Sequence, residues 1–140
     1  MIKLKTLDIL DLDSGLDNLS KLSEKFYDLF NFPFDLSYKM AKIRRKLSEP
    51  IKDYKQEHNK LVKELGKINK LTSRYEFGEN LELYTERHQI LLDSEHEIVD
   101  VYPDSFKTSE LKKYNIPSNY LFQLYPILQD DLSKEKKIEA

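Results

Sequence analysis

The densest group of cations in this sequence lies between positions 39 and 46, a stretch without any acidic residue. A surface that binds a nucleic-acid backbone needs several cations on one face. On a helix, Lys39, Lys42 and Lys46 share a face, and Tyr38 is close enough to stack on a base. The group is a candidate contact for nucleic acid or for a protein partner, and its members are Lys39, Lys42, Arg44, Arg45 and Lys46.

The same run has a simpler interpretation as a solvated helix face. Glu49, Asp53 and Glu57 follow it, and opposite charges three or four residues apart on a helix partly neutralise each other. The sequence holds only three glycines, so the glycine-rich loop that brings a backbone close to phosphate is missing. We therefore favour the solvated face and keep nucleic-acid binding through residues 39–46 as the alternative function.

Three histidines are the other residues whose chemistry needs an explanation. His58 and His88 are expected on facing helices and His96 on a neighbouring strand, so the three could meet around a metal ion. Zinc sites usually draw pairs of ligands that are close in sequence, and these three are far apart. We interpret His58 and His88 as interior or boundary residues of a helical hairpin and predict no metal and no other cofactor.

Signatures of calcium binding and of catalysis are also missing. In a calcium loop that starts at Asp11, glycine should be sixth and glutamate twelfth, but Gly15 is fifth and Leu22 is twelfth. We interpret residues 11–15 as a turn and helix cap. The chain has no cysteine and no serine in a glycine-flanked nucleophile motif. We predict that the protein is not an enzyme.

Composition sets the scale of the fold that positions these residues. The 140 residues suit one domain, and 39% hydrophobic with 34% charged residues is a foldable composition. The net charge of −2 produces no overall field that would attract nucleic acid or membrane. No run of about 20 apolar residues occurs. We expect a soluble protein that does not bind membranes.

The cations must be carried by a long helix over residues 34–70. Its single apolar stripe consists of Leu36, Met40, Ile43, Leu47, Ile51, Tyr54, Leu61, Leu65 and Ile68. A proline inside a helix costs about 3 kcal/mol, yet the stripe stays in phase across Pro50. We therefore favour one kinked helix over two helices, with its end between Gly66 and Thr72.

The remaining patterns predict shorter elements around this helix. A strand at 2–6 should pair with a strand at 95–102, and helices are expected at 16–30, 79–92 and 117–128. Because the connection is short, the helix at 79–92, with Leu81, Tyr84 and His88 facing inward, should run antiparallel to the long one. The predicted fold class is α+β, mostly α: a long kinked helix in an antiparallel hairpin, flanking helices and a small two-stranded sheet. Residues 1–128 form one domain and residues 129–140 a charged, mobile tail.

A family resemblance accompanies this pattern. A short Lys/Leu strand and a first helix are followed by FDLSYKMAKIRRKL at 34–47, Glu49-Pro50, Tyr54, Glu57 and LVKELG at 61–66. This order resembles a family of small bacteriophage proteins of unknown function. The resemblance implies a second helix, an acidic β segment like 95–101 and a closing helix like 116–128, and it carries over no catalytic residue.

These observations lead to a functional prediction. The long stripe has one partner helix of about half its length, which leaves apolar surface for another molecule. We expect a non-enzymatic phage protein that binds other proteins, as a virion or assembly component or as a small effector of a host protein. Its partner would be a second copy, a virion protein or a host protein, and its location the virion or the host cytoplasm.

Overall fold

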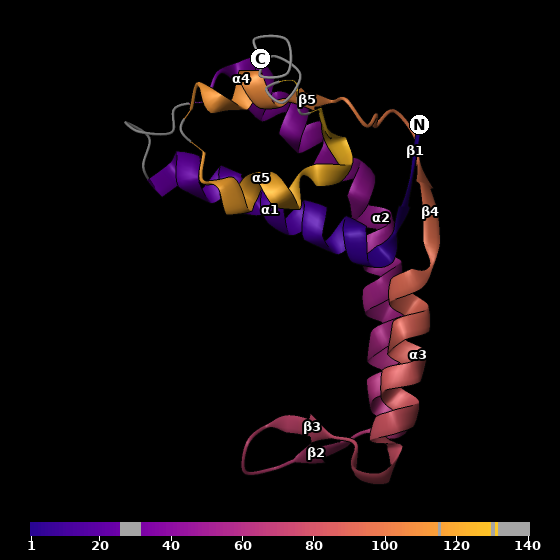
Figure 1. Ribbon diagram of the computed structural model, residues 1–140. Coiled ribbons are helices and arrows are strands. Elements are labelled where there is room, and N and C mark those ends of the chain that lie inside the picture. Colours follow the sequence, from indigo (N-terminus) through magenta and orange to yellow (C-terminus); the bar gives the residue numbers. More distant parts are fainter. Residues whose placement is uncertain (26–31, 115, 130, 132–140) are drawn as a thin grey trace, which may run out of the picture.

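The structure is a computed structural model that describes residues 1–25, 32–114, 116–129 and 131 (Figure 1). Its helices are α1 (Thr6–Lys25), α2 (Phe34–Leu65), α3 (Leu81–Asp93), α4 (Thr108–Lys112) and α5 (Ser118–Gln123), with 3-10 turns η1 (Gly78–Asn80) and η2 (Tyr125–Ile127). Its strands are β1 (Ile2–Lys5), β2 (Lys67–Asn69), β3 (Arg74–Glu76), β4 (Glu95–Ile98), β5 (Phe106–Lys107) and β6 (Leu128–Gln129). The predicted class, α+β and mostly α, is confirmed.

Helix α2 is continuous for 32 residues and contains Pro50 in its interior. Its first half buries Leu36, Met40, Ile43 and Leu47 in the core, as the apolar stripe predicts. The helix is therefore one element and not two helices that meet at Pro50. The predicted kink stays a prediction. The second half of α2 projects from the body (Figure 1).

The predicted pairing of the first strand with a later one is confirmed. Strands β1 and β4 are antiparallel, with Ile2 opposite Ile98 and Leu4 opposite His96. Ile2, Leu4 and Ile98 are buried, which agrees with the alternating pattern of β1. The second strand ends at Ile98 and not at 102, because Asp100 takes a left-handed backbone conformation with φ of 61° that breaks the extended chain.

The prediction for the first helix was wrong at its start. Helix α1 begins at Thr6, so the predicted turn at residues 11–15 lies inside it. Ile9 and Leu12 are fully buried and extend the apolar stripe backwards, and burial outweighs the local turn preference of Asp and Ser. Gly15 serves packing, since a Cβ there would lie 2.6 Å from the Cβ of Gln123 in α5. The predicted end near Phe30 lies outside the described residues.

Helix α2 ends at the first position of the predicted window, but the segment after it differs from the prediction. Gly66 ends the helix, and strands β2 and β3 form an antiparallel hairpin in place of the continued helical period. The Asn69 side-chain oxygen accepts hydrogen bonds from the backbone N–H groups of Leu71 and Thr72, and Ser73 adopts a positive φ of 58°. This turn chemistry reverses the chain, so Ile68 and Leu71 lie in the hairpin and not on a helix.

The C-terminal part packs over α1. Leu111, Leu124 and Ile127 are buried there together with Phe106, whose strand β5 runs parallel to β6. The predicted helix at 117–128 is shorter than expected, because Pro126 lacks an N–H and lies in the 3-10 turn η2. Tyr125 in this turn is 79% exposed, whereas Leu124 and Ile127 on either side are buried.

The predicted tail at 129–140 lies mostly outside the described residues. Gln129 belongs to β6, and the Asp131 carboxylate accepts hydrogen bonds from the backbone N–H and the hydroxyl of Ser109. These bonds hold the pKa of Asp131 below its usual value. The described part of the tail is therefore attached to α4.

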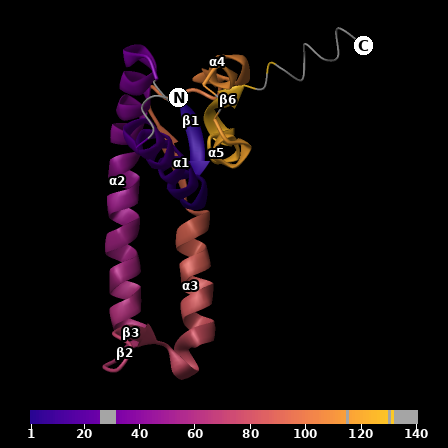
Figure 2. The same cartoon turned by 90° about the vertical axis from the view of Figure 1, so that its left-hand side faces the viewer.

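Figures 1 and 2 show two parts of the molecule. The body contains α1, α4, α5 and the first half of α2. The arm, residues 51–93, contains the second half of α2, the β2–β3 hairpin and α3, which lies beside α2 and leads back to the body. Helix α3 has no buried residue, so the arm has far less core than the body.

Candidate functional site

The structure divides the predicted cation group between different surfaces of α2. Lys39, Lys42 and Lys46 line a cavity of about 490 Å³ together with Asp100 and Asp104, from the loop between β4 and β5. The Lys46 ammonium lies 3.7 Å from the Asp100 carboxylate. Three cations and two carboxylates leave a small net charge in this cavity. Its electrostatic attraction for a polyanion is therefore weak.

Lys39 and Lys42 also interact with groups close by. The Lys39 ammonium donates a hydrogen bond to the Ser105 carbonyl and lies 4.8 Å from the centre of the Phe106 ring. The Lys42 ammonium lies 5.6 Å from the centre of the Tyr38 ring, in the range of a cation–π interaction. These contacts position the two lysines against the protein's own surface.

Arg44 points to the other side and joins α1 to α2. Its Nε donates to Asp13 at 3.0 Å and its Nη1 donates to Asp17 at 3.3 Å. The hydrogen bond to Asp13 raises the pKa of Arg44. The pKa of Asp17 is lowered, first by its hydrogen bond from Lys21 and then by charges that include Arg44. Arg44 is therefore a structural contact between two helices.

Arg45 lies in a second, shallow depression, which we call the basic groove. The groove has a volume of about 650 Å³, and α2 residues 41–59 form its floor with Asp13 of α1 at one side. Its cations are Arg44, Arg45, Lys52 and Lys55. Among the described residues, Arg45, Lys52 and Lys55 form no ion pair.

Lys52 and Lys55 are absent from the sequence-based prediction, because it grouped the cations that lie close together in the chain between positions 39 and 46. Arg45, Lys52 and Lys55 are separated by steps of seven and three, which place them on one helix face. The acids expected to neutralise the run lie elsewhere: Glu49 and Asp53 line a cavity beside β4. Helical spacing was the signal that could have identified the groove.

A ladder of aromatic and histidine side chains joins the two helices of the arm. The hydroxyl of Tyr54 lies 2.7 Å from Nε2 of His88, and Nε2 of His58 lies 2.8 Å from the hydroxyl of Tyr84. The two imidazole ring centres are 4.8 Å apart. Phe77 stacks on Tyr84 at 3.9 Å and ends the ladder. The predicted place of His58 and His88 at the helical interface agrees with this geometry.

Burial sets the protonation of the ladder. It lowers the pKa of His88, and the neighbouring His58 lowers it further. Burial also raises the pKa of the Tyr54 hydroxyl. The two groups therefore favour their neutral forms, as a hydrogen-bonded pair inside an interface should. Leu81, predicted to face inward with them, is 56% exposed.

His96 does not join the other two histidines. It lies on β4 with Nε2 2.8 Å from Oγ1 of Thr6, which also donates to the Ser94 carbonyl at 3.2 Å. A hydroxyl beside an imidazole could act as a nucleophile, but Thr6 is only 2% exposed and its proton is already donated. Within the described residues, no group of three or more side chains could hold a metal ion.

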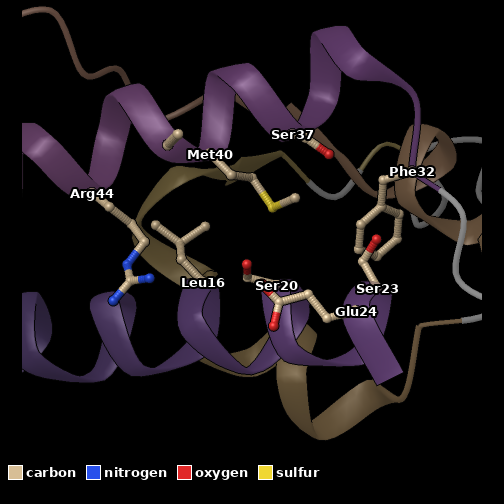
Figure 3. Close-up of a pocket in the computed structure, with 9 residues that line it drawn as sticks. Leu16, Ser20, Ser23, Glu24, Phe32, Ser37, Met40 and Arg44 are labelled. Carbon is tan, nitrogen blue, oxygen red and sulfur yellow. The ribbon is translucent and has the colours of Figure 1, made fainter. Parts of the chain in front are cut away.

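Figure 3 shows a cavity of about 470 Å³ between α1 and α2. Leu16, Met40 and Phe32 supply its apolar surface, and the hydroxyls of Ser20 and Ser37 lie near its rim. Among the described residues, no imidazole lines it, and no hydrogen bond joins the lining carboxylate of Glu24 to a serine hydroxyl. A hydroxyl that is not hydrogen-bonded to a base is a weak nucleophile, so this lining suits packing or binding and not covalent chemistry.

The arm presents apolar side chains to solvent. Leu71 at the turn of the hairpin is 96% exposed, and Ile90 on α3 is 64% exposed. Further exposed apolar side chains on the arm are Ile68, Tyr75, Leu81 and Leu83. Single exposed apolar residues are normal on protein surfaces, and the body also has some, among them Phe34, Phe122 and Tyr125. Several of them on one projecting element make the arm a candidate interaction site.

The fold and these surfaces define an α+β protein, mostly α, with a body and a projecting helical arm. The chain matches no family model, no curated protein and no solved structure. Across the described residues, none of the helices combines the length and apolar content needed to cross a membrane.

Proposed function

We propose that the protein acts without catalysis, by binding another protein through its arm. The observation that carries this proposal is the exposed apolar surface of the β2–β3 hairpin and α3, where Leu71 and Ile90 point to solvent and α3 buries no residue. An element this poorly buried gains little stability from its own contacts. A partner that covers the arm would supply the missing apolar contact area.

The chemistry of the described side chains supports binding over reaction. The three histidines are hydrogen-bonded to Tyr54, Tyr84 and Thr6, and each of these partners is partly or fully buried. In the cavity of Figure 3, Glu24 is a lining carboxylate, but no hydrogen bond between described residues joins it to a serine hydroxyl. We therefore assign no catalytic residue.

The class of partner follows from the sequence resemblance to small bacteriophage proteins. On that basis we propose a virion or assembly component, or a small effector of a host protein, present in the virion or the host cytoplasm. The partner is a second copy of the chain, a virion protein or a host protein. The exposed arm fits each of these roles, since each requires an accessible apolar contact.

The test compares the wild-type protein with arm variants. Ile68→Ser combined with Leu71→Ser removes the hairpin's apolar surface, and Phe122→Ser, which alters an exposed residue of α5 in the body, is the matched control. Light scattering coupled to size exclusion measures self-association at low and high salt. Affinity capture from host lysate and from phage particles, with and without nuclease, measures foreign partners.

We expect an oligomer or a captured protein with the wild type and the control, and its loss with the arm variant. A wild-type monomer that captures nothing, or a partner whose binding does not change in the arm variant, would refute the proposal. Far-UV circular dichroism checks that both variants keep their helices.

A further inference from the structure

The basic groove carries an inference that is independent of the arm's apolar surface. Of its cations, Arg44 is neutralised by Asp13 and Asp17, whereas Arg45, Lys52 and Lys55 are exposed and form no ion pair with a described residue. Asp13 is the only carboxylate among the described residues of its lining, and it is already paired with Arg44. The groove has a clear net positive charge although the whole chain has a net charge of −2.

The positive face continues along α2 beyond the groove. Lys63 is exposed and follows Arg45 by 18 residues, which is five full helical turns, so the two residues lie on the same face. The four cations Arg45, Lys52, Lys55 and Lys63 thus form a row about 27 Å long at 1.5 Å per residue. Between them lie Ser48, Gln56 and Asn59, which can hydrogen-bond to phosphate oxygens.

We infer that this row binds the phosphodiester backbone of a nucleic-acid duplex without reading its bases. A duplex carries one charge per about 1.7 Å of its axis, so the row spans about eight base pairs. The described residues of the lining include no aromatic side chain on which an unpaired base could stack, and such stacking is typical of single-strand binding. The exposed face of α2 lies along the phosphates, and the arm's apolar tip remains free.

Fluorescence anisotropy with a labelled duplex of about 20 base pairs tests the inference. Four phosphate contacts predict a slope of log K against log salt of about −3.6, at 0.9 per contact. Lys52→Gln combined with Lys55→Gln keeps the aliphatic stems and removes two charges. We expect the slope to fall to about −1.8 and the affinity at about 50 mM salt to drop about 10- to 100-fold.

Three comparisons identify the binding face. Lys3→Gln with Lys46→Gln removes the same charge from outside the row, where the two lysines pair with Glu95 and Asp100, and should stay within about two-fold of the wild type. Lys39→Gln with Lys42→Gln tests the cavity on the opposite side and should have an equally small effect. Polyglutamate, as an acidic protein-like competitor, should displace the duplex weakly.

Three results would overturn the inference. The first is a wild-type protein with no salt-dependent affinity for the duplex. The second is an equal or larger loss in either of the comparison variants, which would place binding on another face. The third is displacement by polyglutamate at the same charge concentration as unlabelled duplex, which would identify the groove as a site for an acidic protein segment. Circular dichroism of each variant excludes unfolding as the cause.

Discussion

Acidification should loosen the arm through the ladder of Tyr54, His58, Tyr84 and His88. Because burial and His58 lower the pKa of His88 in the folded protein, the unfolded chain takes up the proton first as the pH falls. The stabilising contribution of neutral His88 is complete above the unfolded value of about 6.5. It is lost as the pH falls from there toward the lowered folded value.

The magnitude follows from the distance between the rings. Two unit charges 4.8 Å apart repel by about 1 kcal/mol in water and by about 3.5 kcal/mol at an effective dielectric constant of about 20. Both rings are partly exposed, so we expect a loss of about 1 to 2 kcal/mol. The bond between Tyr54 and His88 can persist with the imidazole as donor, and the loss is therefore mainly charge repulsion and desolvation.

Urea unfolding followed by circular dichroism at about pH 7.5 and about pH 5 measures this change. A loss of about 1 to 2 kcal/mol lowers the midpoint by roughly 0.5 to 1 M at an m-value of about 2 kcal/mol per M. The control is His58→Gln with His88→Gln, whose amides keep a partner for each tyrosine and do not titrate. Equal acid sensitivity of the control and the wild type, or an NMR-measured His88 pKa above about 6.5, would refute the reasoning.

Three further predictions concern stability. Replacing Arg44 by Ala should lower the free energy of unfolding by about 1 kcal/mol, since its ion pairs are partly exposed. In a double-mutant cycle with Asp13→Asn, the coupling free energy should account for most of that loss. Gly15→Ala should cost about 1 to 3 kcal/mol, because the new methyl group meets the Cβ of Gln123, and Gln123→Gly should relieve it. Leu47→Ala should cost about 2 to 5 kcal/mol, as this side chain is fully buried. Urea unfolding at pH 7.5 measures all three.

Each of these predictions has a result that would contradict it. Additive effects of the Arg44 and Asp13 changes would show that the ion pair contributes nothing. An unchanged Gly15→Ala variant would mean that α5 moves freely on α1. A cost for Leu47→Ala no larger than that of Leu71→Ala, where the side chain is 96% exposed, would contradict the assigned core.

Periodicity explains which parts of the fold the sequence predicts. The long helix and the pairing of β1 with β4 follow from repeated apolar spacing, which burial enforces. The start of α1 does not follow, because Asp11, Asp13 and Ser14 favour a turn in isolation and only the tertiary burial of Ile9 and Leu12 overrides them. The β2–β3 hairpin has three-residue strands, too short for an alternating pattern to be recognised.

The candidate site illustrates the same distinction. The cation group at 39–46 is evident in the sequence, but its division among three surfaces depends on what packs beside α2. Asp100, Asp104 and Asp13 come from distant segments, and no local pattern indicates that they face Lys46 or Arg44. The row that includes Lys52 and Lys55 could have been found from helical spacing alone.

The pairing of Ile2 with Ile98 has a consequence for the protein during its synthesis. Strand β1 is made before its partner β4, which is added only about 90 residues later. At a translation rate of about 5 to 20 residues per second, Ile2 and Leu4 wait roughly 5 to 20 s without their partner strand. During this interval α1 has no sheet to anchor its first turn. A ribosome-bound form truncated before Glu95 should therefore be more sensitive to protease than the released protein.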